Sequence, residues 1–482
     1  MRLIGNKTHG DLAEIDMAEF IDQFMYDFKT EHVGKDLFRA KEHEEDIIII
    51  NEITKSQFPL SLKAYGDGPL QLSTDSDQKM FPYLEKQGKD IQNKNKIKEI
   101  FSSEDFSKIK TQGIKYAGSK LKIIPYILES IKDLEIKTVL DGFSGSTRVS
   151  QAFAQAGYDV TSSDISYCSE VCAKCFLLSS KDKEYYQKII DTLNSLRGYD
   201  GWFTANYGGD EEMTVKMPFQ KKNTRKLDAI REKIEELNLN DIDKSVILTS
   251  LLFALDSVDS TLGHFSSYLS KWSDRSYKDL FLKLPNLQKT TGNHKVIRED
   301  IFEVVRNNEF DLAYFDPPYG SNNEKMPPSR VRYNAYYHIW TTVVRNDKPA
   351  LFGKVNRRED TRDLVSASVF EEFRKNEKGA FIAMEAIRTL IQNTKARYVL
   401  LSYSSGGRAT KEELTRILTE SGKVLKIIEI DYKKNIMASM SWTNEWINSN
   451  SSHKEYLFLM EKVPFIKNIS YSTKSHKEIV FT

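Results

Sequence analysis

The sequence is poor in features that would place it in a narrow class. It contains three cysteines in 482 residues, too few for a disulfide framework, and no apolar run of about 18 residues that could cross a membrane. Its polar beginning, MRLIGNKTHGD, is not that of a signal peptide. These absences exclude a disulfide-rich secreted scaffold and a helical membrane protein from the expected classes, so we expect a cytoplasmic protein.

A strong charge of one sign is also missing. Lys and Arg number 70 against 69 Asp and Glu, which gives a formal net charge of +1 at pH 7. Any contact with nucleic acid therefore has to come from local basic patches rather than from a global field. The composition, 29% charged and 40% hydrophobic, is that of a soluble globular protein, and the length allows roughly two to four domains.

Residues 1–110 form a separate unit in the sequence pattern. Apolar spacing predicts a helix over residues 12–28, and residues 47–50 and 59–65 are strand-like. Residues 86–110 are rich in Lys, Gln, Asn and Ser and predict an exposed linker. The unit has the pattern of a small α+β fold.

A group of charged residues in this unit has two interpretations. Asp46 precedes one strand, Glu52 follows it, and Lys63 lies in the next, which is close to the arrangement of metal-dependent nucleases. Two positions before Lys63, however, stands Ser61, so one metal ligand is missing unless Glu52 or Glu45 replaces it. The alternative is an ordinary β-hairpin with solvated charges.

Strands and helices alternate from about residue 111 onwards. Gly118 and Ser119 precede a helix expected over residues 121–131, and Lys120 lies in its first turn. The helix dipole disfavours a lysine at this end of the helix, so its presence indicates an anionic ligand nearby. A buried strand then ends at Asp141, and a loop of small residues leads to a helix that begins near Thr147. We expect this loop to let the backbone approach a ligand.

A second strand, residues 158–162, ends near Asp164. An acid there can bind the ribose hydroxyls of a nucleoside cofactor, and Asp141 can accept hydrogen bonds from an amine or hydroxyl. Capping of a helix is the alternative role of each aspartate taken alone.

Three cysteines follow at the spacing of an iron–sulfur signature, Cys168, Cys172 and Cys175. The same positions share one face of a helix with apolar residues, and buried free cysteines behave as small hydrophobic residues. We expect the packing role.

Residues 180–293 interrupt the alternation. They contain an aromatic loop (198–209), a basic helix start (221–226) and two helical patterns (227–237 and 245–258). Aromatic side chains beside lysines suit DNA contact, whereas a helical cap with merely solvated charges is the alternative.

The most informative stretch is DLAYFDPPYG, residues 311–320. A buried strand has to end at Asp316, because proline cannot donate to a sheet ladder and biases the preceding residue to extended conformations. Asp316 supplies a carboxylate, Pro317 and Pro318 leave carbonyls without a competing N–H, and Tyr319 offers a flat ring. Such a loop can hold an exocyclic amine while the ring stacks on its base, or it can be a plain strand-to-helix turn.

The strand before this one is expected to end at Asp300, and further strands are expected at residues 397–402, 424–430 and 456–460. Between them, residues 321–361 predict a polar loop. It is rich in basic and aromatic residues: Arg330, Arg332, Tyr333, Tyr336, Tyr337, Arg357 and Arg358.

Taken together, the strands that end in acids predict a doubly wound α/β sheet with its functional edge along one line. At this point the chain resembles the Dam-like, α-group DNA adenine methyltransferases. Their order of motifs is a K-Y/W-x-G-x-K segment, a glycine-rich loop, a ribose-binding acid, a target-recognition insert and DPPY, and residues 111–465 show that order. The resemblance implies a Rossmann-like methyltransferase sheet with a helical insert and the small N-terminal unit.

The expected domains follow from this resemblance. They are an N-terminal unit with its linker (1–110), a methyltransferase core (111–179 and 294–465), a helical insert that recognises the target (180–293) and a tail (466–482). Residues 321–361 are expected to take part in recognising the DNA sequence as well.

The resemblance also implies partners and residue roles. The methyl donor would be S-adenosylmethionine, without a metal, and the substrate double-stranded DNA, with no membrane involved. A cognate restriction endonuclease would be a partner in a restriction–modification system. The implied cofactor-binding residues are Tyr116, Lys120, Asp141, Phe143, Gly145, Asp164, Asp300 and Asp316, with Asp141–Gly145 near the methionine part, Asp164 at the ribose and Asp300 near the adenine.

In the implied catalytic loop, Asp316 and the Pro317 carbonyl accept hydrogen bonds from the two N–H groups of the exocyclic amine of a flipped adenine. Tyr319, beside Pro318, stacks on the base. The loop around Gly145 departs from the family pattern, which often ends in Gly, because it reads Ser-Gly-Ser-Thr. Three alternatives stay open. They are methylation of another planar amine (cytosine, an RNA base or protein glutamine), a fused restriction–modification protein with an N-terminal nuclease or its remnant, and a DNA-binding protein without activity.

Overall fold

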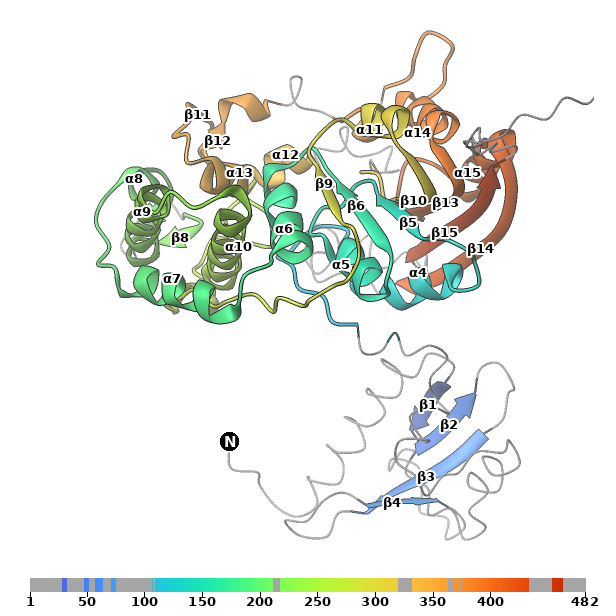
Figure 1. Cartoon of the computed structure of the whole chain (residues 1–482), viewed down its shortest axis with the longest axis horizontal. Helices are drawn as coiled ribbons and strands as arrows, with labels where there is room; N and C mark the ends of the chain where they lie inside the picture. The colour runs from blue at the N-terminus through green and yellow to red at the C-terminus, as the bar shows by residue number, and fades with distance from the viewer. Residues whose placement is uncertain are drawn as a thin grey trace, which may run out of the picture. The chain divides into compact units, whose positions relative to one another are not determined.

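The structure is a computed structural model in which the chain divides into two units, Met1–Lys108 and Ile109–Thr482 (Figure 1). The residues it describes are 28–32, 47–51, 57–63, 71–74, 106, 109–210, 217–319, 332–362, 368–372, 374–432 and 453–462. Among these residues, no helix has both the length and the apolar character needed to span a membrane.

In the first unit, four strands form an antiparallel sheet in the order β1-β2-β3-β4. They are β1 (Phe28–His32), β2 (Ile47–Asn51), β3 (Gln57–Lys63) and β4 (Gln71–Thr74). The two predicted strands are therefore present, while Phe28 begins a strand instead of ending a helix. The rest of the predicted helix, together with Glu45, Asp46 and Glu52, lies outside the described residues, so the nuclease hypothesis stays a prediction.

The second unit is built on a seven-stranded sheet in the order β14-β15-β13-β10-β5-β6-β9. Its strands are β5 (Thr138–Asp141), β6 (Asp159–Ser163), β9 (Lys295–Ile297), β10 (Glu309–Phe315), β13 (Lys395–Ser404), β14 (Gly422–Tyr432) and β15 (His453–Lys462). The strands from β9 to β13 in this order are parallel, whereas β15 pairs antiparallel with both β13 and the edge strand β14. The predicted Rossmann-like α/β class is confirmed.

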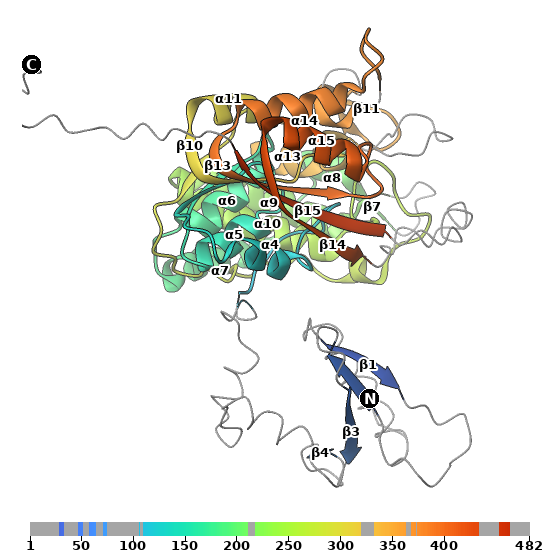
Figure 2. The same ribbon diagram turned by 90° about the vertical axis from the view of Figure 1, so that its right-hand side faces the viewer.

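Helices cover both faces of this sheet (Figure 2). On one side lie α4 (Ile124–Ile131), α5 (Arg148–Gln155) and α6 (Tyr167–Leu178), and on the other α11 (Ile301–Asn307), α14 (Ile382–Asn393) and α15 (Lys411–Ser421). Central strands such as β10 are apolar over most of their length because both of their faces are buried. The predicted helix over residues 121–131 begins late, at Ile124, because a proline occupies its first turn.

The insert between β6 and β9 is helical and shares a hydrophobic core with α6. Its helices are α7 (Lys183–Ser195), α8 (Trp202–Tyr207), α9 (Lys221–Glu236), α10 (Asp241–Val258) and the 3-10 turn η2 (Asp274–Tyr277), with a two-stranded pair, β7 (Gly208–Gly209) and β8 (Phe219–Gln220). Cys168, Cys172 and Cys175 are free thiols buried in this core, which is the packing role expected from their shared helical face.

The segment from residue 332 onwards is structured, so the prediction of a loop over residues 321–361 was wrong for its described part. It contains α12 (Tyr333–Tyr336), α13 (His338–Arg345), β11 (Leu351–Phe352), β12 (Arg357–Arg358) and η3 (Glu359–Thr361), and η4 (Val369–Glu371) follows. The side chains of Ile339, Trp340 and Val343 in α13 are buried in the same core as the insert. Arg330 lies outside the described residues.

Two arginines of this segment are internal rather than available to DNA. Arg332 is buried and its Nη1 donates to the carbonyl of Glu371 at 3.2 Å. Arg358, with a side chain 2% exposed, makes two bonds to Asp347 (2.7 and 2.8 Å) and two to Asp360 (3.0 and 2.7 Å). Their charge is therefore used inside the protein.

We expect Arg358→Ala to lower the free energy of unfolding of the second unit by about 3 kcal/mol, because it removes a buried guanidinium with four hydrogen bonds and leaves Asp347 and Asp360 with Arg345 alone as a counter-charge. Arg362→Ala is the matched control, since Arg362 sits at the surface with Glu359 and its loss should change little. Denaturant titrations of both variants measure the difference. Equal midpoints would contradict a structural role for Arg358.

Candidate active site

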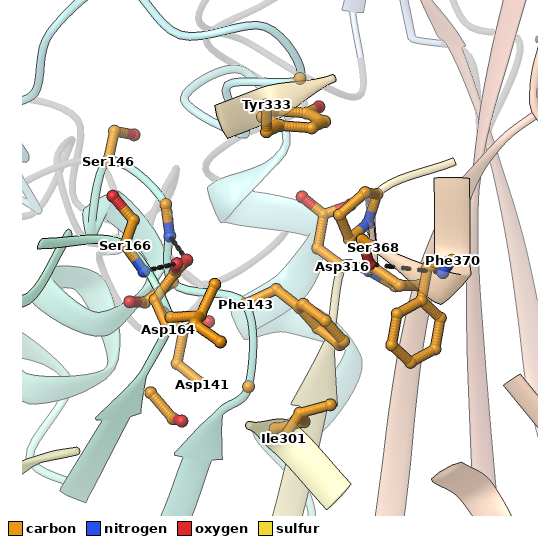
Figure 3. Close-up of a pocket in the computed structure, with 18 of the residues that line it drawn as sticks. Asp141, Phe143, Ser146, Asp164, Ser166, Ile301, Asp316, Tyr333, Ser368 and Phe370 are labelled. Atoms are coloured by element: carbon orange, nitrogen blue, oxygen red, sulfur yellow. Dashed lines mark hydrogen bonds between the residues drawn. The ribbon is translucent and has the colours of Figure 1, made fainter. Parts of the chain in front are cut away.

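A cavity of about 500 Å³ opens at the carboxyl ends of β5, β6 and β10. Every residue singled out from the sequence as a site residue lines it: Tyr116, Lys120, Asp141, Phe143, Gly145, Asp164, Asp300, Asp316, Pro317, Pro318 and Tyr319. Asp141 and Asp164 lie on one side and Asp316 on the other (Figure 3). The structure thus brings these residues together, while their individual roles stay predictions.

Asp141 anchors the first side of the cavity. Its side chain is buried and accepts a hydrogen bond from Ser150 Oγ at 2.5 Å. Burial raises the pKa of Asp141 to about 7, against the lowering effect of the Ser150 bond. The backbone that follows is tied to the sheet, since Gly142 N–H donates to the Tyr314 carbonyl at 2.9 Å.

Two glycines of the next turn pack so closely against aromatic rings that a side chain at either position would collide with a ring. A Cβ on Gly142 would lie 2.7 Å from the Phe315 ring. Gly145 has φ +47°, and a Cβ there would lie 3.0 Å from the Tyr116 ring. Both positions therefore require glycine, one for space and the other for backbone conformation as well.

Asp164 has a structural task besides lining the cavity. Its carboxylate accepts hydrogen bonds from the backbone N–H groups of Gly145 and Ser166, both at 2.8 Å (Figure 3). Burial raises its pKa above the ordinary value, although these bonds oppose the shift. The next residue, Ile165, is 59% exposed and lines the cavity, an apolar contact that the sequence analysis did not single out.

Asp300 lines the cavity, but not as the end of a strand. β9 ends at Ile297, and Asp300 is the N-cap of α11, where its carboxylate accepts from the Phe302 N–H at 2.8 Å. The predicted strand end was therefore three residues late, because the acid belongs to the following helix.

The DPPY loop forms the opposite side. Asp316 Oδ1 lies 2.8 Å from Lys120 Nζ, and its side chain is 16% exposed. Burial raises the pKa of Asp316 to about 7; Lys120 opposes the shift and Glu455 adds to it. Tyr319 is half-buried and lines the cavity, its hydroxyl 3.2 Å from Lys120 Nζ and its ring 5.0 Å from that of Tyr403. It is not sealed in the core.

Lys120 is buried before α4 and pairs with protein carboxylates. Besides Asp316 it contacts Glu455 Oε1 at 3.2 Å and donates to the Gly118 carbonyl at 3.0 Å. Burial by itself lowers the pKa of Lys120, but Asp316 and Glu455 outweigh it and raise the pKa well above its ordinary value. The anionic partner predicted for this lysine is thus found within the protein.

Aromatic side chains from distant segments close the cavity. Tyr116 stacks on Tyr337, with ring centroids 4.4 Å apart, and Tyr333 donates to the Ala117 carbonyl at 3.1 Å. On another wall, Phe143 meets Phe370 edge to face at 5.1 Å. Tyr333 and Tyr337 were noted in the sequence only as loop aromatics, and Phe370 was not singled out, because no periodic pattern connects it to the cavity.

Comparison with known proteins identifies the class. Residues 116–436, about two thirds of the chain, match the sequence model of the D12 class N6 adenine-specific DNA methyltransferases. The chain belongs to this family, as its resemblance to the Dam-like enzymes implied, and membership implies S-adenosylmethionine as the methyl donor. Among the described residues, no group of three His, Cys, Asp or Glu side chains is placed to hold a metal ion.

Several individual proteins are also similar to this chain over most of its length. The chain is 29% identical over 375 residues to Modification methylase StsI of Streptococcus sanguinis. These aligned residues make up 74% of this chain and 53% of the relative. It is 28% identical to Modification methylase LlaI of Lactococcus lactis subsp. lactis (75% and 56%) and 24% identical to Type II methyltransferase M.NlaIII of Neisseria lactamica (72% and 99%). The chain thus spans about half the length of the first two relatives and nearly all of the third.

Proposed function

We propose that the protein is a site-specific DNA adenine methyltransferase that moves a methyl group from S-adenosylmethionine to the exocyclic amine of a flipped adenine. The observation that carries this proposal is the position of Asp316–Tyr319 in the same cavity as Asp141, Gly145 and Asp164. One cavity therefore holds both a loop suited to an amine and a set of groups suited to a nucleoside cofactor.

The cavity fits S-adenosylmethionine in space and in chemistry. Gly142 and Gly145 let the turn after β5 pack against the Phe315 and Tyr116 rings, and Ile165 presents an apolar side chain beside the buried Asp141 and the half-buried Asp164. We assign Asp141 and the turn to Gly145 to the methionine part, Asp164 to the ribose and Asp300 to the vicinity of the adenine, and we assign Tyr116 and Lys120 to contacts with the cofactor. When bound, the cofactor supplies a methyl group on a sulfonium.

The chain's own residues prepare the amine. The lone pair of the adenine amine is delocalised into the ring, so the nitrogen is a poor nucleophile. The Asp316 carboxylate and the Pro317 carbonyl accept hydrogen bonds from its two N–H groups. These bonds favour a more pyramidal nitrogen as positive charge develops on it. Because Asp316 is largely buried, this interaction is stronger than it would be in water. Tyr319 stacks on the base, which has to leave the duplex to reach the cavity.

The activity should depend on pH through Asp316. The ionised carboxylate is a stronger acceptor for the amine N–H groups than the protonated acid and stabilises developing positive charge, and its pKa is raised to about 7. We therefore expect kcat to fall as the pH decreases through about 7 and to level off above it. A kcat profile between pH 5.5 and 9 measures this, and a flat profile down to pH 5.5 would contradict the role.

Gly145→Ala should weaken S-adenosylmethionine binding by about 10-fold or more, because the added Cβ pushes on the Tyr116 ring inside the cavity. The matched control is Gly379→Ala, which also has a positive φ (+77°) but has nothing within 4 Å of the added Cβ. Both variants carry the backbone strain, so calorimetric titration with the cofactor isolates the cavity effect. Equal affinities would count against this cofactor position.

We further infer that the helical insert reads the DNA target and that the protein is the modification part of a restriction–modification system. The first inference is supported by the basic start of α9, where Lys221 and Lys222 are partly exposed, and the second by the names of the related modification methylases and type II methyltransferase. A cognate restriction endonuclease would then recognise the same site.

The direct test offers duplex DNA, RNA and protein to the purified full chain with radiolabelled S-adenosylmethionine. We expect label only in DNA, as N6-methyladenine within one sequence. Label in cytosine, RNA or glutamine would replace the proposed substrate with one of the alternatives.

A further inference from the structure

Glu455 is the one described carboxylate that contacts Lys120 besides Asp316. It lies on β15, beyond the residues that match the family model, and 139 positions after Asp316 (455 − 316). Its side chain is 8% exposed and Ser402 Oγ donates to its Oε1 at 2.8 Å. A carboxylate this buried, in contact with the lysine that pairs with Asp316 of the proposed catalytic loop, calls for a physical reason.

The geometry around Lys120 Nζ is crowded with acceptors. Four oxygens lie within 3.2 Å, those of Asp316 (2.8 Å), Gly118 (3.0 Å), Tyr319 (3.2 Å) and Glu455 (3.2 Å). An ammonium group has three N–H donors. Lys120 donates hydrogen bonds to the Gly118 carbonyl and the Tyr319 hydroxyl and forms ion pairs with both carboxylates, so Asp316 does not have exclusive use of its charge.

The charges of this cluster explain what Glu455 adds. Asp316 and Lys120 alone would form a neutral pair, and a dedicated cation would lower the basicity of the carboxylate that has to accept the amine. With Glu455 the cluster has a net charge of −1. Lys120 then fixes the orientation of Asp316, while the second carboxylate offsets its positive charge.

We propose that Glu455 is a positioning residue for methyl transfer: through Lys120 it holds Asp316 in place and keeps its carboxylate a strong acceptor. This proposal rests on the function proposed above. It assigns to β15, at the far end of the chain from the family's first motif, a part in the amine half of the site.

The groups that face Asp316 come from several elements and have to be considered together in any pH experiment. They are Lys120 before α4, Asp141 on β5, Tyr314 on β10, Tyr319 in the loop, Tyr333 on α12 and Glu455 on β15. Of the acids among them, Asp141 belongs to the cofactor side. Its titration should therefore appear in cofactor affinity, whereas that of Asp316 should appear in kcat.

The test compares Glu455→Gln with wild type for kcat, KM and the pH profile of DNA methylation. Gln keeps the volume and an oxygen for Ser402, but removes the charge. We expect kcat at pH 8 to fall about 10-fold, and the acidic limb of kcat to move about one unit to lower pH because a like charge beside Asp316 is lost. Affinities for S-adenosylmethionine and DNA should stay within about 3-fold.

Two matched variants separate charge from packing. Glu461→Gln, on the same strand but paired with Arg397 at the surface, should leave kcat and the limb unchanged. Glu455→Asp keeps the charge, so its limb should stay at the wild-type pH even where kcat falls; it also carries the test should Glu455→Gln not fold.

An unchanged rate and limb in Glu455→Gln, or a limb shift equally large in Glu455→Asp, would overturn the proposal. An equal loss of cofactor and DNA binding in Glu455→Gln would also overturn it, since that is the result of a purely structural role. Because wild type is assayed in parallel, its failure to methylate DNA would count against the proposed function instead.

Discussion

Asp316→Ala should abolish methyl transfer while retaining S-adenosylmethionine binding at least in part. The variant loses the buried acceptor that stabilises charge on the amine nitrogen, and removal of one such preorganised group costs about 10²- to 10³-fold in kcat or more. The fold should survive, because Lys120 keeps Glu455, Tyr319 and the Gly118 carbonyl as partners. Single-turnover methylation and calorimetric titration with the cofactor measure the two halves of this expectation.

The matched control is Glu309→Gln. Glu309 is exposed at the first position of β10, the strand that Asp316 follows, so the variant removes a negative charge from the other end of the same element. It should retain full activity. Substantial turnover by Asp316→Ala would refute the assignment of this carboxylate to the reaction.

The second large effect is expected at Tyr319. Stacking of a base on an aromatic side chain contributes about 1–3 kcal/mol, so Tyr319→Ala should lower kcat/KM for DNA by about 10- to 100-fold. Tyr319→Phe keeps the ring and loses only the hydroxyl contact with Lys120, and it should retain most of the activity. The comparison therefore isolates the ring from the hydroxyl.

A fluorescent adenine analogue at the target position gives an independent reading of the same variants. Its emission should rise when wild type or Tyr319→Phe draws the base out of the duplex. Equal kcat/KM and equal emission in Tyr319→Ala would show that the base does not stack there.

The sequence predicted the part of the site that local chemistry determines. β10 and the turn after it were predictable because an apolar run meets two prolines, and β5 and its loop because an apolar run meets Asp141 and small residues. Parallel strands place such loops at one edge, which is why all the predicted residues share a cavity.

The parts that were not predicted depend on contacts between distant segments. α12 spans only Tyr333–Tyr336, too short for a periodic signal, and its link to the Ala117 carbonyl joins positions 216 residues apart. Glu455 meets Lys120 only because β15 pairs beside β13 in the folded sheet. Basic residues such as Arg358 suggested DNA contact, yet Arg358 is buried and pairs with Asp347 and Asp360 inside the protein.

The proposed reaction is methylation of adenine in DNA in the cavity lined by the loop Asp316–Tyr319. The most direct measurement is modification-detecting sequencing of DNA from a host that expresses the full chain, beside hosts that express Asp316→Ala or Glu309→Gln. We expect N6-methyladenine at one recurring sequence with wild type and Glu309→Gln and none with Asp316→Ala. Unmodified adenine with wild type, or equal modification with Asp316→Ala, would contradict it.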